Sequence, residues 1–246
     1  MGSLTGKVAL VTGGGRGIGA GIAERLATDG ADVAITYNTA AERAAAVVGK
    51  IEETGRRGLA IAAPASDVDA VARAVRRTVD EFGRLDVLVN NAGIFTYAPI
   101  DELSLEQFDE TVAVHVRAVF VAVRTAVEHL PEGGRIINIG SNLAERVPGP
   151  GLSLYSLSKS ALTGFTKGLA RDLGPRGITA NVVHPGSTDT EMNPADGADA
   201  DAERALTALG RYSTPADIAA TVSHLAGESG RNITGTSITV DAGANA

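Results

Sequence analysis

The chain has 246 residues, a net charge of −7, 30 glycines and no cysteine. Its length suits one large α/β domain with a substantial buried core. The negative charge argues against general nucleic-acid binding, because phosphates attract basic surfaces. Without cysteine the chain forms no disulfide, no thiolate metal site and no cysteine nucleophile, which fits a reducing compartment.

The hydropathy pattern indicates neither a signal peptide nor a membrane-spanning helix. Residues 1–8 lack the apolar core of a signal peptide and lead directly into a predicted strand. The most apolar helical stretch, residues 112–127, is interrupted by His115, Arg117 and Arg124, so it is no membrane span. No cluster of His, Asp and Glu has metal-ligand spacing. We therefore expect a cytoplasmic protein with no metal, no nucleic-acid partner and no membrane partner.

The first strand and helix enclose a glycine-rich turn. Residues 7–12 form a short apolar run that is typical of a parallel strand covered on both faces. Residues 13–19, GGGRGIG, follow, and then a helical pattern continues to about Thr28. In this order the glycines let the backbone approach a pyrophosphate, and the helix N-terminus attracts the anion. The arrangement predicts dinucleotide binding; a plain flexible turn is the alternative.

The end of the second predicted strand, residues 31–38, favours NADP. An NAD site has an Asp or Glu here that bonds the ribose 2′-hydroxyl, but this strand ends in Thr36-Tyr37-Asn38. Arg16 in the glycine loop and Arg43 beyond the strand are cations that can accommodate a 2′-phosphate. We therefore expect NADP(H) to be preferred over NAD(H).

Strands and helices alternate through the rest of the chain. Asp67 and Ser104 are placed as helix N-caps, Ser104 in a capping box. Residues 187–212 predict a mobile flap with one short helix. The alternation predicts a single domain, residues 1–246, with a three-layer, doubly wound, Rossmann-type sheet of about seven mostly parallel strands. The expected helices cover residues 41–55, 68–82, 104–130, 155–173 and 215–227, and the remaining strands cover 59–63, 85–90, 135–140, 178–184 and 236–241.

Three side chains next to the strand at 135–140 suggest proton transfer. Tyr155 and Lys159 are four residues apart, so they share one face of a helix. An ammonium near a phenol favours the phenolate, so we expect Lys159 to lower the pKa of Tyr155 from its reference of about 10. Ser141 follows the strand at the edge where open α/β sheets bind ligands, and its hydroxyl can bond a substrate oxygen. The Tyr–Lys pair alone is a weak signal, because most such pairs lie on solvated helix faces.

Taken together, these motifs resemble those of the short-chain dehydrogenase/reductase family over essentially the whole chain. The resemblance implies hydride transfer between NAD(P)H and a carbonyl or alcohol, as in carbonyl reductases and 3-oxoacyl reductases, and it commonly implies a homotetramer. The matching motifs are Thr12-Gly13-x-x-x-Gly17-x-Gly19, Asn90-Asn91-Ala92-Gly93, Ser141, Tyr155-x-x-x-Lys159, and Pro185-Gly186 with Thr190.

The resemblance also implies a role for each catalytic residue. Tyr155 is the general acid in ketone reduction and the base in reverse. Lys159 lowers the pKa of Tyr155 and holds the nicotinamide ribose, while Ser141 bonds the substrate oxygen. The expected cofactor contacts are Gly13, Arg16, Gly17, Ile18, Gly19, Tyr37, Asn38, Ala65, Asn91, Ala92, Gly93, Tyr155, Lys159, Pro185, Gly186, Thr188 and Thr190.

The chain departs from the family pattern at two positions near the site. His115 stands where the family usually has an Asn that completes a proton relay with the Lys. An imidazole can hold a water and titrate near neutral pH, so we expect either a relay role or a packing role. The acid that usually bonds the adenine is replaced by Pro64, followed by Ala65, so backbone and packing are expected to hold the adenine. Asp67 is an alternative, although its position suggests a helix cap.

The substrate side is expected to be roomy and partly apolar. Ser141 and Tyr155 are 14 residues apart, one more than the commonest family spacing, and the longer loop resembles that of hydroxynaphthalene reductases. The leading hypothesis is an NADPH-dependent carbonyl reductase. The alternatives are a 3-oxoacyl-carrier reductase, a polyol or sugar dehydrogenase and, in another class, a nucleotide-binding regulatory protein with little turnover. The expected pocket residues are Phe95, Tyr97, Leu143, Val147, Leu152 and Met192, and His184 is expected to pack beneath the nicotinamide loop.

Overall fold

A computed structural model of the chain describes residues 4–246. One sheet of seven parallel strands forms its centre, in the order β3-β2-β1-β4-β5-β6-β7. The order and direction of the strands confirm the predicted doubly wound α/β class. The strands are β1 (Val8–Val11), β2 (Asp32–Tyr37), β3 (Gly58–Ala62), β4 (Val87–Asn90), β5 (Arg135–Ile139), β6 (Thr179–Pro185) and β7 (Ser237–Val240).

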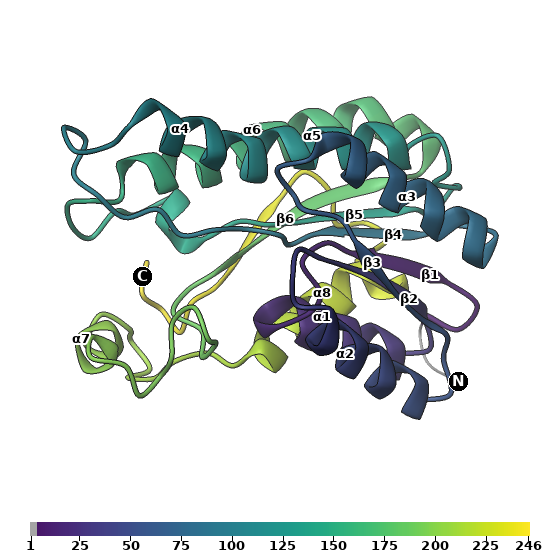
Figure 1. The fold of residues 1–246 in the computed structure, drawn as a ribbon, viewed down its shortest axis with the longest axis horizontal. Helices are drawn as coiled ribbons and strands as arrows, with labels where there is room; N and C mark the ends of the chain where they lie inside the picture. Colours follow the sequence, from purple (N-terminus) through teal and green to yellow (C-terminus); the bar gives the residue numbers. More distant parts are fainter. Residues whose placement is uncertain (1–3) are drawn as a thin grey trace.

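Helices lie in a layer on each side of the sheet (Figure 1). One layer contains α1 (Gly17–Thr28), α2 (Ala41–Glu53) and α8 (Pro215–Ala226). The other contains α3 (Val68–Phe82), α4 (Leu105–Val112), α5 (Ala118–Ala126) and α6 (Ser153–Leu173). The short helix α7 (Ala200–Ala205) lies outside both layers, on the side of the molecule where the C-terminus is marked. The predicted flap thus contains one short helix.

The strands are apolar because both of their faces are buried. Successive side chains of a strand point to opposite faces. In β1, Ala9 and Val11 join the core under α1 and α8, while Leu10 joins the core under α3, α5 and α6. A strand in this position has no solvent-exposed face, and its continuous apolar run follows from that.

The helix predicted over residues 104–130 differs in two ways. It begins as expected, because Ser104 and Gln107 form a capping box. It is interrupted, however, by a π-helical turn at Ala113–Arg117, which inserts an extra residue in the turn and leaves His115 only 1% exposed. It also ends earlier, at Ala126, because the following residues form tight turns toward Pro131 and β5.

Other local predictions are confirmed. The Asp67 side chain accepts a hydrogen bond from Ala70 N–H at 2.9 Å and so caps α3. Pro215 occupies the first turn of α8, behind a capping box at Thr214. Across residues 4–246, no helix combines the length and apolarity that crossing a membrane requires. The prediction of no signal peptide concerns residues 1–8, of which 1–3 lie outside the described residues.

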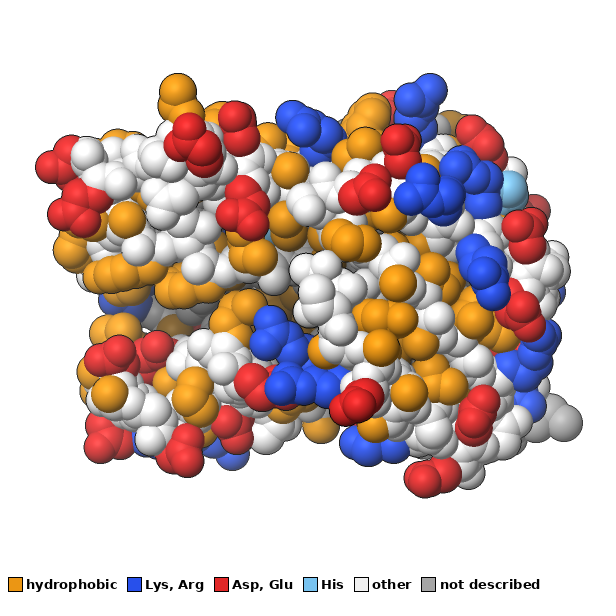
Figure 2. Space-filling view, in the orientation of Figure 1, with side chains coloured by type: hydrophobic (Ala, Val, Ile, Leu, Met, Phe, Trp, Pro, Cys, Tyr) orange, Lys and Arg blue, Asp and Glu red, His pale blue; other side chains and the backbone are white. Residues whose placement is uncertain are grey.

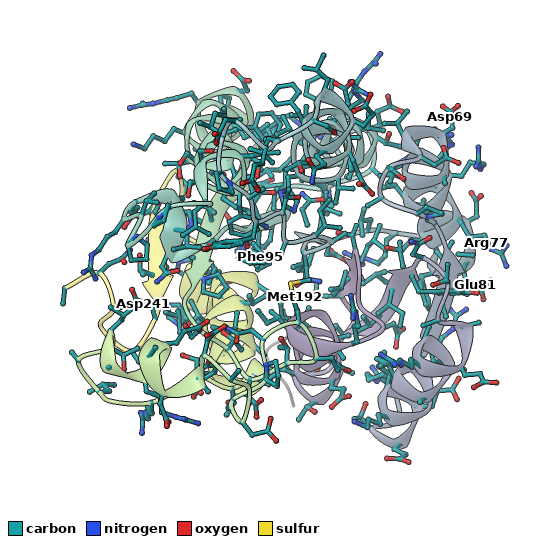
Figure 3. The ribbon with its side chains drawn as sticks, turned by 60° about the vertical axis from the view of Figure 1, so that its left-hand side comes forward. Asp69, Arg77, Glu81, Phe95, Met192 and Asp241 are labelled. Carbon is teal, nitrogen blue, oxygen red and sulfur yellow. The ribbon has the colours of Figure 1, made fainter. Side chains whose placement is uncertain are left out.

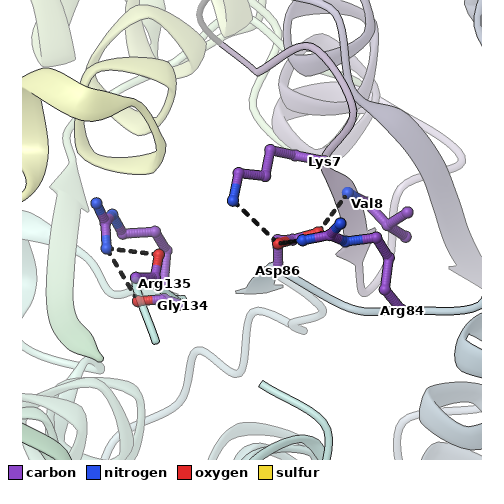
Figure 4. Close-up of polar contacts among 7 residues, drawn as sticks. Lys7, Val8, Arg84, Asp86, Gly134 and Arg135 are labelled. Carbon is purple, nitrogen blue, oxygen red and sulfur yellow. Dashed lines mark hydrogen bonds and ion pairs between the residues drawn. The ribbon is translucent and has the colours of Figure 1, made fainter. Parts of the chain in front are cut away.

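A buried carboxylate joins the starts of β1 and β4 (Figure 4). Asp86 is 1% exposed and accepts a hydrogen bond from Val8 N–H at 2.9 Å. It also accepts two bonds of 2.7 Å from Arg84 and one of 3.2 Å from Lys7 Nζ. Burial raises the pKa of Asp86, but the bonds from Arg84 and Val8 and the charge of Lys7 outweigh it and lower the pKa.

We expect Asp86→Asn to lower the free energy of unfolding at pH 7 by about 1–3 kcal/mol, because the charge-assisted bonds are lost. The native pKa of Asp86 lies below its unfolded value, so its stabilisation is full above the unfolded pKa of about 4 and is lost as the pH falls through the native pKa. Urea unfolding at pH 7 and near pH 3 should show the difference between variant and parent shrinking in acid. Asp80→Asn, at an exposed position, is the control. An equal difference at both pH values would contradict this account.

Candidate functional site

The sheet register brings the sequence motifs to one edge. Val11 of β1 is opposite Val89 of β4, and Asn90 is opposite Asn138 of β5. Because parallel strands end at a common edge, the glycine loop, the loop after Asn90 and Ser141 all begin there. In Figure 1 this edge faces the side on which α7 and the C-terminus lie.

The glycine loop is shaped to approach an anion. A Cβ at Gly14 would lie 2.6 Å from Ile35 Cγ2, and one at Gly19 would lie 2.4 Å from the carbonyl oxygen of Gly13, so both positions require glycine. Helix α1 follows directly. In the described structure Arg16 makes no side-chain capping bond, and the first turn holds no acid. The first N–H groups of α1 and its dipole therefore favour a bound phosphate.

The loop after β4 is bonded to the glycine loop. Thr12 Oγ1 accepts hydrogen bonds from the N–H groups of Asn91 at 3.0 Å and Ala92 at 3.1 Å. Asn91 Nδ2 donates in return to the carbonyls of Thr12 at 3.0 Å and Gly13 at 3.1 Å. Four hydrogen bonds thus hold together two of the segments that were predicted to contact a dinucleotide.

The end of β2 carries no acidic residue, and the arginines expected to serve a 2′-phosphate are Arg16 of the glycine loop and Arg43 of α2. Tyr37 is partly exposed there and Asn38 is exposed, while Arg16 is exposed in the glycine loop. Arg43 is also exposed, and its Nη1 lies 3.8 Å from Glu191 Oε1 of the flap. Both arginines are thus exposed cations that can bind a phosphate group.

The start of the flap lies against the glycine loop. A Cβ at Gly17 would lie 3.3 Å from Thr190 Cγ2. Thr188 is buried, and its Oγ1 donates to the Gly186 carbonyl at 2.9 Å. Gly186 itself has no room for a side chain, because a Cβ there would lie 2.5 Å from Asp241 Cβ. Gly186 and Thr188, which the family resemblance assigns to cofactor binding, are thus closely packed.

Tyr155 and Lys159 share one face of α6, as predicted. Lys159 is 5% exposed, and its Nζ lies 5.7 Å from the centre of the Tyr155 ring. The ammonium donates to the Ile139 carbonyl at 3.2 Å, at the end of β5. Burial lowers the pKa of Lys159 to about 8, because a charged ammonium is poorly solvated there.

The expectation that the pKa of Tyr155 lies below its reference of about 10 is wrong for the arrangement in this structure. Burial raises the pKa of Tyr155 to about 12, and the hydrogen bond with Ser141 opposes this only in part. The physical reason is that the phenolate loses its hydration, while the ammonium is bonded to a backbone carbonyl instead of the phenol oxygen. At neutral pH Tyr155 is therefore a protonated phenol.

His184 orients Ser141, which the sequence did not reveal. His184 is fully buried, and its Nδ1 accepts a hydrogen bond from Ser141 N–H at 3.0 Å. A Cβ at Gly140 would lie 2.3 Å from the same nitrogen, so the ring requires glycine beside it. The Ser141 hydroxyl oxygen also accepts a bond from Leu143 N–H at 3.2 Å. In the sequence, the only available signal was a histidine at the end of the predicted strand 178–184.

His115 has protein partners on both ring nitrogens. Nε2 accepts a hydrogen bond from Ile94 N–H at 3.0 Å, and Nδ1 lies 2.8 Å from Ser158 Oγ. Burial and the charge of Lys159 lower the pKa of His115 to about 3, so the imidazole is neutral. Ser158 was not among the predicted site residues; its spacing of three from Tyr155 on the helix was the available signal.

Figure 2 shows a hollow on its left side. The Phe95 ring meets the Tyr155 ring edge-on at 4.9 Å and stacks on Tyr97 at 6.3 Å. Phe95 is 49% exposed and Met192 is 50% exposed. Leu152, by contrast, is buried.

The view in Figure 3 separates this region from the outer surface. Phe95 and Met192 lie in the middle of the view, and Asp241 lies to one side of them. Asp69 and Arg77 of α3 point outward, away from them. The aromatic ring of Phe95 thus lies against Tyr155, while the charges of Asp69 and Arg77 face solvent.

Comparison with known proteins agrees with this geometry. The profile of the family described as "Enoyl-(Acyl carrier protein) reductase" matches residues 13–245. The Escherichia coli K12 "Cyclic-di-GMP-binding biofilm dispersal mediator protein" is 43% identical over 241 residues, which cover 98% of each chain. Hydroxynaphthalene reductase of Aspergillus fumigatus is 44% identical over 189 residues, 77% of this chain and 69% of that protein.

A solved structure is closer still. A short chain dehydrogenase from Burkholderia cenocepacia J2315, in complex with NADP, is 61% identical and superposes with a TM-score of 0.98 over 99% of this chain and all of that one. The motifs, the sheet order and these similarities agree. The chain belongs to the short-chain dehydrogenase/reductase family, whose members are oxidoreductases.

Proposed function

We propose that the protein is an NADPH-dependent carbonyl reductase that converts a ketone to an alcohol, reversibly. The observation that carries the proposal is the grouping of Ser141, Tyr155 and Lys159 at the end of β5, beside the glycine loop. The proposed catalytic unit is the whole chain as one domain.

The charge states of these groups suit reduction. NADPH, when bound, supplies the hydride. Tyr155 is protonated at neutral pH and donates its phenolic proton to the carbonyl oxygen as the hydride arrives. The Ser141 hydroxyl stabilises the negative charge that develops on that oxygen. The Lys159 ammonium, buried nearby, favours the phenolate that remains until Tyr155 is reprotonated. In the reverse direction Tyr155 accepts the proton.

The residues present fit NADP(H). The glycine loop and the N-terminus of α1 suit the pyrophosphate, and Arg16 and Arg43 suit the 2′-phosphate. The NADP complex of the Burkholderia relative supports this choice. The proposed remaining contacts are Gly13, Gly17, Ile18, Gly19, Tyr37, Asn38, Ala65, Asn91, Ala92, Gly93, Tyr155, Lys159, Pro185, Gly186, Thr188 and Thr190.

The substrate proposal is a ketone with an aromatic or otherwise apolar body. The aromatic rings of Phe95 and Tyr97 beside Tyr155 support it, as does the similarity to a hydroxynaphthalene reductase. A 3-oxoacyl-carrier substrate or a polyol remains an alternative. We also propose a cytoplasmic homotetramer. The exposed apolar groove between α5 and α6, with Phe120 and Phe165 at its centre, supports an assembly of copies.

A second candidate function is a nucleotide-binding regulator with little turnover. The Escherichia coli relative, which matches across 98% of this chain, supports it, because that protein is named for binding cyclic di-GMP. Both candidates use the same nucleotide site, so binding alone does not separate them. Turnover does.

We expect NADPH absorbance to fall when the protein meets aryl ketones, 3-oxo esters or quinones, and to fall more slowly with NADH. Tyr155→Phe should lower kcat by about 10²- to 10⁴-fold, because the general acid is removed. NADPH binding, measured by fluorescence, should change little. Silence of the parent across the panel, with tight binding of NADPH or cyclic di-GMP that persists in the variant, would contradict the reductase and favour the regulator.

We expect ketone reduction to be fastest below about pH 8 and to fall as the pH rises through that value, because Lys159 loses its ammonium there. Tyr155 stays protonated across this window. Lys159→Arg should remove the fall, since a guanidinium keeps its charge. Lys167→Met, at an exposed position on the same helix, should leave the profile unchanged. A parent rate that stays level or rises between pH 7 and pH 9 would speak against this role.

A further inference from the structure

His115 connects two segments that contribute to the site. Its Nε2 bonds Ile94 N–H at 3.0 Å, in the loop that carries Gly93 and Phe95. Its Nδ1 lies 2.8 Å from Ser158 Oγ on the catalytic helix α6. Ser158 Oγ in turn donates to the backbone carbonyl of Tyr155 at 2.7 Å. Three hydrogen bonds thus lead from the loop to the backbone of the proposed general acid.

The protons of these three hydrogen bonds can be arranged in only one way. A backbone N–H only donates, so His115 Nε2 is the acceptor for Ile94 and carries no proton. A neutral ring then carries its proton on Nδ1, which donates to Ser158 Oγ. The Ser158 hydroxyl proton is left for the Tyr155 carbonyl, which only accepts. Each donor and acceptor in these three hydrogen bonds therefore has its partner when His115 is neutral.

The surroundings oppose a second proton on the ring. His115 is 1% exposed, and the titratable groups that face it are the Lys159 ammonium and the neutral Tyr155 phenol, whose ring lies edge-on at 5.7 Å. A Cβ at Gly93 would lie 3.1 Å from His115 Nε2 and 3.5 Å from Lys159 Nζ, so Nε2 and the ammonium lie on the same side of the loop. A protonated Nε2 would also point its N–H at the Ile94 N–H. A second proton on the imidazole is therefore unfavourable at neutral pH.

The geometry points to His115 and Ser158 as a positioning pair that keeps the loop around Ile94 in register with Tyr155, with His115 neutral throughout turnover. This inference rests on the proposed reductase function, because it assigns the pair to the placement of its general acid. The Phe95 ring, one residue beyond Ile94, is held 4.9 Å from the Tyr155 ring by the same connection. A relay role in which the His115 ring itself transfers the proton would instead require a ring that exchanges protons. The positioning role requires one that does not.

The tautomer can be measured directly on ¹⁵N-histidine-labelled protein by NMR. We expect the His115 signal, identified by its loss in His115→Asn, to show the Nδ1–H tautomer and to stay constant from pH 5 to pH 9. His184 is the internal reference, because its Nδ1 accepts from Ser141 N–H and its proton therefore lies on Nε2. A His115 signal that titrates between pH 5 and pH 8, or that shows the Nε2–H form, would overturn the inference.

Kinetics separate positioning from proton transfer. We expect Ser158→Ala and His115→Asn each to lower kcat for a ketone by between about threefold and a hundredfold, since small misplacements of a reacting group have large effects. The double variant should be no slower than the slower single variant, because both changes break one connection. NADPH affinity should stay within about threefold of the parent, since the bonds between Thr12 and Asn91 remain.

Ser156→Ala is the matched control. Ser156 is buried on the same helix, and its Oγ has no hydrogen-bond partner among residues 4–246, so its loss should leave kcat unchanged. Both pair variants should keep the shape of the parent pH profile. A shifted profile in His115→Asn alone, with Ser158→Ala unaffected, would overturn the inference in favour of a relay. If the parent reduces no ketone, the proposed function fails, while the NMR measurement still decides the state of His115.

Discussion

Removal from water shifts the pKa values of the titratable groups around the end of β5. Burial raises the pKa of Tyr155 to about 12, lowers that of Lys159 to about 8 and, with the Lys159 charge, lowers that of His115 to about 3. At neutral pH Tyr155 therefore holds its proton, Lys159 is charged and His115 is neutral. This combination suits the proposed ketone reduction, because Tyr155 already carries the proton that it donates when the substrate arrives.

The sheet makes this desolvation possible. Parallel strands covered on both faces end together, and their loops close over the same edge. Glycines stand where a side chain would separate these loops: a Cβ at Gly140 would meet the His184 ring at 2.3 Å, and one at Gly19 would meet the Gly13 carbonyl at 2.4 Å. The same close approach that buries Lys159 also leaves backbone exposed to a nucleotide at the glycine loop.

Much of this could be predicted from the sequence, because the signals are local. The apolar run of β1, the Asp67 cap and the Ser104 capping box each depend on residues a few positions apart. The bonds of His115 with Ile94 and Ser158 and the bond of His184 with Ser141 join residues distant in the sequence, so no local pattern marked them. The pKa of Tyr155 was predicted in the wrong direction because spacing on a helix says nothing about burial.

The most direct test of this account is a spectroscopic titration of the Tyr155 phenol, by subtracting the phenolate absorbance of Tyr155→Phe from that of the parent. The pKa of about 12 predicts that the difference shows no phenolate below about pH 10. A phenolate signal that appears near neutral pH would mean that the charge of Lys159 outweighs burial. Tyr155 would then rest as a base, and the description of the site as a preformed proton donor would be wrong.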